Sequence, residues 1–155
     1  MVFSKLSAQI DPHISAAHLG RVFIKALQTK DAILAESLLP SDSETFRKIA
    51  TKETEGKSSN ELAEMIQRVK IRLKSKFENI LYEADKDKID LDKIIYKSAD
   101  TEVLPFPEAI LFGMNLNYKY QSDEGAFVLI VVNLEDKWYL LEIAKSADVF
   151  TNSEE

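Results

Sequence analysis

The sequence predicts an α+β domain in which N-terminal helices pack on an antiparallel sheet of about four strands. Apolar residues recur at three- and four-residue spacing through the first half, and from Lys93 onward they alternate with polar residues. The 155 residues, 45% hydrophobic and 30% charged, have the size and composition of one globular domain. We therefore expect a single domain over residues 1–150 and a disordered tail over 151–155.

Three helices are predicted before residue 58, and the second and third are short. Asp11 and Pro12 can begin the first helix, which carries an apolar face up to about Thr29. Asp31 can cap a second helix over 32–39, which Pro40 ends. The third helix should begin at Ser41 or Ser43 and run through Phe46, Ile49 and Ala50.

A fourth and much longer helix gives the strongest single signal. Ser58 and Glu61 have the spacing of a capping box. Apolar residues then form a stripe roughly 80° wide on a helix about 40 Å long: Leu62, Ile66, Val69, Leu73, Phe77, Ile80 and Ala84. Two basic rows flank the stripe, Arg68/Arg72/Lys76 and Lys70/Lys74, which we expect to be solvated. Ile71 and Tyr82 lie opposite the stripe and hint at a contact surface.

Four strands are expected in the second half, over 93–98, 109–120, 126–134 and 137–144. A turn at Ser122–Gly125 should join the second strand to the third, and Glu135–Asp136 the third to the fourth. The third strand is apolar on both faces, which predicts a central position. One layer of helices can cover only one of these faces, so we expect a homodimer through the sheet.

Charge is distributed unevenly along the chain. Residues 1–46 carry 4 basic and 5 acidic residues (−1), 47–76 carry 9 and 4 (+5), and 78–155 carry 7 and 17 (−10). Basic charge confined to one segment argues against nucleic-acid binding, which needs a broad basic face. The basic rows could instead contact anionic lipid or an acidic partner, although a solvated helix face is the simpler interpretation.

The compartment is inferred from what the sequence lacks. It contains no cysteine, no secretory h-region near its start, and no run of 18 apolar residues that could span a bilayer. As written, the chain is expected to be cytoplasmic. It would be periplasmic or surface-anchored if a signal segment were missing from the sequence.

The chain resembles the nuclear-transport-factor-2-like and cystatin-like α+β superfamilies over most of its length. The resemblance rests on the Phe23–Leu39 helical opening and on a meander that ends with Asp136-Lys-Trp-Tyr-Leu-Leu-Glu-Ile143. Two features depart from it: the fourth helix is unusually long, and the first strand follows it. The resemblance implies a curved, cone-shaped sheet around helices, a pocket at the open end, and often a dimer through the outer face of the sheet. Such folds host enzymes, ligand binders and interaction proteins, so fold alone does not assign function.

Five residues are candidates for lining this pocket: His18, Tyr96, Tyr118, Trp138 and Glu142. Aromatic walls with a few polar tips suit a small apolar ligand, although core and edge-strand packing explains the same aromatics. Glu142 or His18 could act as an acid or base, but histidines at the start of a helix, His13 included, are more often structural.

No cofactor or metal is predicted. The four carboxylates within Asp85–Asp92 suggest calcium, but they fail the EF-hand pattern because Ile89 and Asp90 occupy the fifth and sixth positions and Tyr96 the twelfth. The leading functional hypothesis is a non-enzymatic ligand-binding or protein-interaction domain. The alternative is a small isomerase or hydratase that acts on an apolar compound in the cone.

Overall fold

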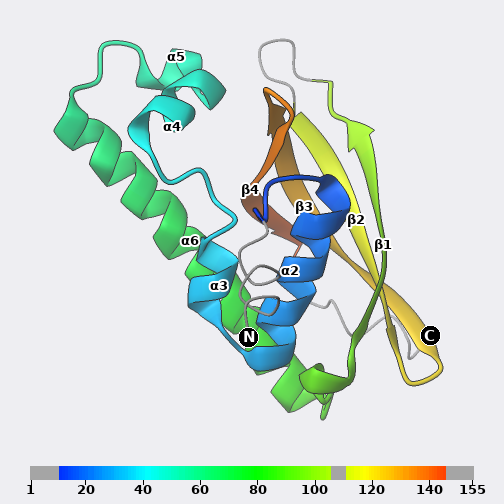
Figure 1. The fold of residues 1–155 in the computed structure, drawn as a ribbon. Helices are drawn as coiled ribbons and strands as arrows, with labels where there is room; N and C mark the ends of the chain where they lie inside the picture. Colours follow the sequence, from blue (N-terminus) through cyan, green and yellow to red (C-terminus); the bar gives the residue numbers. More distant parts are fainter. Residues whose placement is uncertain (1–10, 106–110, 146–155) are drawn as a thin grey trace, which may run out of the picture.

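The computed structural model describes residues 11–105 and 111–145, and it confirms the α+β class. Helices precede a curved, unclosed antiparallel sheet, as Figure 1 shows. The helical elements are α2 (Ala16–Thr29), α3 (Ala32–Glu36), α4 (Ser43–Ile49), α5 (Thr51–Thr54), α6 (Ser59–Lys86) and the 3-10 turn η1 (Leu91–Lys93). The strands are β1 (Ile95–Val103), β2 (Leu111–Tyr120), β3 (Asp123–Leu134) and β4 (Lys137–Lys145), paired in chain order as a meander.

The first helix begins later than predicted. Ser15 is its N-cap, and the Ser15 side chain accepts a hydrogen bond from the His18 N–H. Asp11 is instead held outside the helix, because its carboxylate accepts the His13 N–H and pairs with Lys137 at the start of β4. The prediction that Asp11 and Pro12 begin this helix is therefore wrong. The cap of α4 also differs, since Asp42 accepts the Thr45 N–H.

The long helix α6 matches its prediction closely. Ser58 Oγ accepts the Glu61 N–H at 3.2 Å, and Glu61 Oε1 accepts the Ser58 N–H at 2.8 Å, which completes the capping box. Six of the seven stripe residues are buried, and Val69 packs against both core clusters. Ile71 and Tyr82 are exposed, as predicted. In the described parts of the chain, no helix combines the length and apolarity needed to cross a membrane.

The sheet agrees with the predicted alternation but not with every predicted boundary. β1 runs to Val103, five residues past its predicted end, because its polar second half pairs with β2. The first hairpin turns at Gln121 and Ser122, so β3 already begins at Asp123. Glu135 and Asp136 both have positive φ, at 54° and 68°, as a two-residue hairpin turn requires. The predicted start of the second strand at 109 lies outside the described residues.

The main core lies between α2, the second half of α6 and the inner face of the sheet. Phe23 of α2 meets the rings of Phe77 and Phe127 edge-on, with centroids 6.2 and 6.0 Å away. Helix α2 approaches the sheet closely at Gly20, where an added Cβ would lie 2.8 Å from the Leu116 side chain. A glycine at this position therefore lets helix and sheet touch.

A smaller core is separate from the main one. It is formed by Phe46 of α4 with Leu62 and Ile66 from the first half of α6. Figure 1 shows α4 and α5 beside the upper end of α6. α4 also meets the sheet, because Lys48 Nζ lies 3.3 Å from the Glu135 carboxylate in the turn between β3 and β4. We call α4, α5 and residues 59–70 the helical lobe.

Candidate functional site

The structure distributes the five predicted pocket residues over the sheet and its surroundings. Tyr96 and Tyr118 are cross-strand partners on β1 and β2. Tyr118 pairs with Gly125 on β3, whereas Trp138 pairs with Asn133 at the other end of the same strand. Eight residues of strand separate these two positions, which is roughly 26 Å. Tyr118 and Trp138 therefore belong to opposite ends of the sheet.

Tyr118 is a core residue. Its ring stacks on Phe127 with centroids 4.8 Å apart, and its hydroxyl lies over Gly125, where an added Cβ would be 2.5 Å away. Burial raises the pKa of Tyr118 to about 12. The phenol therefore keeps its proton at neutral pH. Its pair partner Tyr96 is half-buried, and the Arg21 guanidinium lies 4.8 Å from the centre of the Tyr96 ring.

Glu142 and Trp138 have structural partners of their own. The Glu142 carboxylate lies 3.2 Å from Lys76 Nζ of α6, and the same ammonium donates to the Ile143 carbonyl at 2.9 Å. Trp138 packs against Phe112 with ring centroids 5.0 Å apart. Lys76 and Glu142 therefore link α6 to β4.

The two histidines lie near the start of α2. His18 belongs to the first turn, where its backbone N–H donates to the Ser15 cap. His13 Nδ1 donates to the Trp138 carbonyl over 2.7 Å, and its ring lies 4.4 Å from the Tyr139 ring. Of the five predicted residues, the structure brings only Tyr96 and Tyr118 together as sheet partners.

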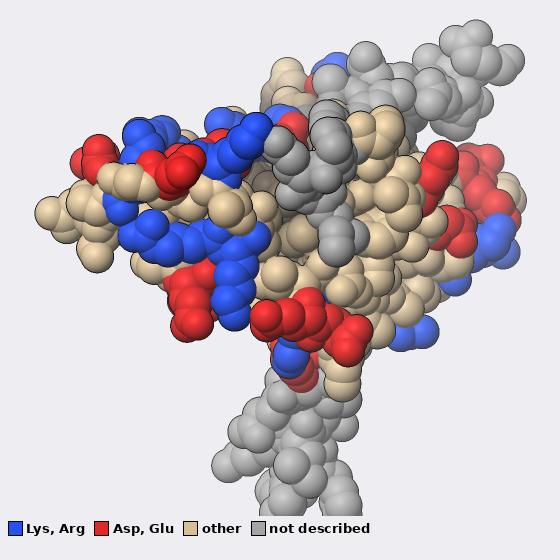
Figure 2. Space-filling model, turned by 90° about the horizontal axis from the view of Figure 1, so that it is seen from above, with Lys and Arg blue, Asp and Glu red and all other residues tan. Residues whose placement is uncertain are grey.

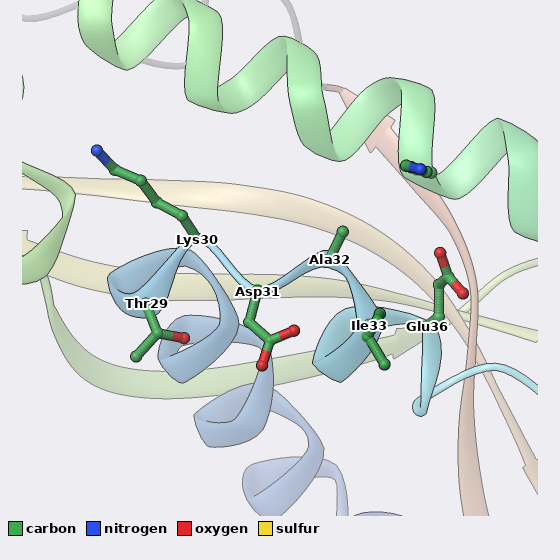
Figure 3. Close-up of a pocket in the computed structure, with 7 residues that line it drawn as sticks. Thr29, Lys30, Asp31, Ala32, Ile33 and Glu36 are labelled. Carbon is green, nitrogen blue, oxygen red and sulfur yellow. The ribbon is translucent and has the colours of Figure 1, made fainter.

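A different surface gathers exposed apolar and cationic side chains, at the junction of α3 and α6. A shallow hollow of about 450 Å³ lies there, lined by Thr29, Lys30, Asp31, Ala32, Ile33, Glu36 and Lys74. Figure 3 shows Lys30 at one end of the hollow, Glu36 at the other, and α6 along its upper side. One carboxylate oxygen of Asp31 is already engaged, because it caps α3 by accepting the Leu34 N–H.

Two isoleucines are exposed on this surface. Ile33 of α3 lines the hollow and is 78% exposed, and Ile71 of α6 is 58% exposed. Ile71 is not among the residues that line the hollow, but it lies one helical turn from Lys74, which does. Sequence reasoning singled out Ile71 but missed Ile33. A signal was present, because Ile33 lies about 200° around the helix from the buried Ala35.

Four cations on α6 surround Ile71 in sequence: Arg68, Lys70, Arg72 and Lys74. No ion pair between described residues involves any of them. In contrast, Lys76 on the same helix is paired with Glu142. Figure 2 shows Lys and Arg gathered over the helical lobe, with only scattered Lys and Arg over the sheet at the other side. Arg68 and Lys74, one turn before and after Ile71, share its face of α6, whereas Lys70 and Arg72 lie about 100° from it on opposite sides. We call Ile33, Ile71, Lys30, Arg68 and Lys74 the α3–α6 surface.

A second hollow, of about 490 Å³, lies across β1, β2 and β3. Asn117 occupies its centre and donates to Ser98 Oγ at 2.9 Å and to Asp100 Oδ2 at 2.8 Å. Lys97 and Glu124 form an ion pair of 2.7 Å beside it. This hollow is polar and its side chains are already hydrogen-bonded to one another, so it differs from the predicted apolar pocket.

The acidic run over 85–92 forms the end of α6 and the turn after it. Asp90 donates its backbone N–H to the Tyr120 hydroxyl at 3.0 Å and pairs with Lys93 at 3.8 Å. Among the described residues, no group of three histidine or carboxylate side chains is arranged to hold a metal ion.

The comparisons with known proteins assign neither a family nor a function. Neither the family models nor the curated proteins nor the solved structures gave a match. The resemblance to the nuclear-transport-factor-2-like and cystatin-like superfamilies therefore stays a prediction from the sequence pattern. The α+β fold, in contrast, is observed.

Proposed function

We propose that this protein is a non-enzymatic interaction domain whose α3–α6 surface binds an acidic segment of a partner protein. The observation that carries this proposal is the combination of exposed Ile33 and Ile71 with Arg68 and Lys74, two cations that have no ion-pair partner among the described residues. Isolated apolar residues on a surface are ordinary, but here Ile33 lines a hollow between two helices and Ile71 lies one turn from Lys74, which also lines it. Apolar anchors ringed by charge are typical of protein recognition.

The same features favour a protein partner over lipid or nucleic acid. The apolar stripe of α6 is buried in the core, so the helix has no broad apolar face to insert into a bilayer. Basic charge is confined to one segment of the chain, whereas nucleic-acid binding needs a broad basic face. An acidic protein segment with apolar side chains satisfies both the cations and the isoleucines.

The sheet dimer and the small apolar ligand stay predictions. The basis of the dimer is unchanged, since β3 carries apolar residues on both faces: Phe127, Leu129 and Val131 are buried, and Val128 and Ile130 are half-buried. Light scattering over a range of concentrations tests the dimer, and a strict monomer would count against it.

The interaction proposal is tested with a labelled amphipathic helical peptide of glutamate and leucine, about five turns long. Its Kd is measured by fluorescence anisotropy at about 50 and 200 mM salt, because screening weakens exposed charge contacts. The double variant Arg68→Glu/Lys74→Glu should lose about tenfold or more in affinity, and Ile33→Ser/Ile71→Ser should lose a similar amount. The matched control Lys25→Glu/Lys119→Glu makes the same change in net charge on exposed positions elsewhere and should bind like the wild type.

Two outcomes would overturn this assignment. If both charge-reversal pairs weaken binding equally, net charge and not the α3–α6 surface is responsible. If phosphatidylserine vesicles or duplex DNA bind more tightly than the peptide, and Arg68→Glu/Lys74→Glu abolishes that binding, the partner class is wrong.

A further inference from the structure

The two edges of the sheet differ in how their backbone groups are used. At the β4 edge, the Trp138 N–H donates to the His13 carbonyl at 2.9 Å, and the Leu140 N–H donates to the Leu38 carbonyl at 2.8 Å. Lys76 Nζ binds the Ile143 carbonyl of the same strand. The segments before α2 and after α3 therefore occupy the β4 edge.

The backbone direction of β1 follows from one hydrogen bond. The Leu104 N–H donates to the Leu111 carbonyl at 2.9 Å, in register with the pairing of β1 and β2. Neighbouring residues of a strand point their N–H and C=O to opposite sides, so those of Ala99, Thr101 and Val103 point away from β2. In the part of the chain that the structure describes, no residue forms a hydrogen bond with these outward groups.

This open edge is long and accessible. β1 has nine residues, its last four are exposed, and Val103 is 65% exposed. Figure 1 shows no described helix or strand beyond β1 on that side of the sheet. Natural proteins usually cover or shorten such an edge, because it can pair with another chain. Here only the bulge between Tyr96 and Ser98 interrupts it.

The side chains of β1 define what kind of strand can be added. Asp100 and Glu102 alternate along one face, and Thr101 and Val103 along the other. A strand added at this edge places its side chains directly opposite these residues, where opposite charges stabilise and like charges destabilise the pair. Cations at alternate positions, separated by a threonine or an aliphatic residue, therefore complement the edge.

A second copy of β1 fits this edge poorly. In an antiparallel self-pair, the outward residues must face outward residues, which limits the register to alignments centred near Ala99, Asp100 or Thr101. An alignment centred on Thr101 puts Asp100 of each copy opposite Glu102 of the other, and one centred on Asp100 puts the two Asp100 carboxylates opposite each other. In an alignment centred on Ala99, the two Asp100 carboxylates are diagonal neighbours two residues apart. Repulsion between these carboxylates disfavours the self-pair.

We propose that the free edge of β1 binds an extended segment of a partner protein that carries lysine or arginine at alternate positions. The segment adds a fifth strand, and its backbone pairs with Ala99, Thr101 and Val103. Its cations lie opposite Asp100 and Glu102. This site is on a different element from the α3–α6 surface, so each proposal can fail without the other.

The test uses a capped peptide of nine residues, the length of β1, that alternates lysine with threonine and valine. A matched peptide has glutamate in place of lysine. The expected result is that the lysine peptide shifts the amide resonances of Ala99, Thr101 and Val103 and slows their hydrogen exchange, whereas the glutamate peptide does neither. Glu102→Lys should weaken the lysine peptide about tenfold or more and strengthen the glutamate peptide.

Thr101→Pro tests the backbone contact itself. It removes an outward N–H and leaves the bonds between β1 and β2 intact, so it should abolish peptide binding, while Thr101→Ala should bind normally. A urea melt checks that the proline variant is folded. If it is not, the test rests on Glu102→Lys, which should bind the glutamate peptide more tightly and the lysine peptide more weakly than the wild type does. Equal binding of both peptides, or normal binding by folded Thr101→Pro, would overturn the proposal. A dimer of the free protein that Thr101→Pro dissociates would also overturn it, since a second copy would then be the occupant.

Discussion

The helical lobe should unfold separately from the rest of the domain when its small core is damaged. Phe46, only 6% exposed, shares this core with Leu62 and Ile66 alone among buried residues. Phe46→Ala should cost the lobe about 3 kcal/mol, the lower end for Phe→Ala, because a small cluster on the surface can partly collapse. Helices of the length of α4 and α5, with seven and four residues, are not stable alone.

Native-state hydrogen exchange measures this effect directly. The reporters are the Ala50 N–H, bonded to the Phe46 carbonyl at 2.9 Å, and the Thr54 N–H, bonded to the Ala50 carbonyl at 3.0 Å. A loss of about 3 kcal/mol in opening free energy corresponds to exchange about 100-fold faster. The amides of β3 should change little in the same variant, because the lobe opens without the sheet.

Phe77→Ala is the matched control. Phe77 lies on the same helix but belongs to the main core, where it contacts Phe23. This variant should lower the free energy of global unfolding by about 3–5 kcal/mol and accelerate exchange throughout the domain. If Phe46→Ala accelerates exchange in β3 as much as in α4, the two cores form one cooperative unit and the reasoning fails.

Two predictions concern pH. Since burial raises the pKa of Tyr118 to about 12, the folded state keeps a proton that the unfolded chain loses near pH 10, so stability should fall as pH rises between these values. Tyr118→Phe should flatten this fall in urea melts, and an unchanged slope would refute the assignment. At low pH, hydrogen bonds from the backbone N–H of Thr45 and of Ser58 hold the pKa of Asp42 and Glu61 below their usual range. The stability that these two carboxylates contribute is present above about pH 4.5 and is lost as pH falls through their folded-state pKa values, so the urea midpoint should drop on acidification. The drop should be smaller in Asp42→Asn, because asparagine keeps the helix cap but carries no charge.

Much of the helical half follows from local sequence. The capping box at Ser58 and Glu61 and the stripe from Leu62 to Ala84 depend on contacts within a few residues. The stripe also settled which side of α6 is exposed, because the period of 3.6 places Ile71 opposite the buried residues. The turn at Glu135–Asp136 is equally local.

The boundaries that were wrong depend on distant partners. Asp11 is a good cap in isolation, but Lys137 of β4 competes for its carboxylate, and the helix begins at Ser15 instead. The second half of β1, with Asp100 and Glu102, has poor strand propensity and is nonetheless a strand, because β2 supplies the pairing. Asp11 and Lys137 are 126 positions apart, and the extent of β1 depends on its register with β2, so the local pattern of neither segment reveals these contacts.

The candidate sites divide in the same way. Alternation along a strand determines the face on which a side chain lies, and so Tyr118 and Trp138 could be assigned to the same face of the sheet from sequence. It does not determine the register between strands, and the observed register places these two aromatics at opposite ends. The α3–α6 surface and the free edge of β1 likewise depend on which elements lie beside each other. The sequence by itself determined the α+β class and the face of residues in α6 and in uninterrupted strands, because both follow from local periodicity. Bulges break this rule, as in β4, where Leu140 and Ile143 are both buried. Tertiary structure alone decided which side chains meet and which sheet edge has no partner among the described residues, because that depends on pairing between residues far apart in the chain.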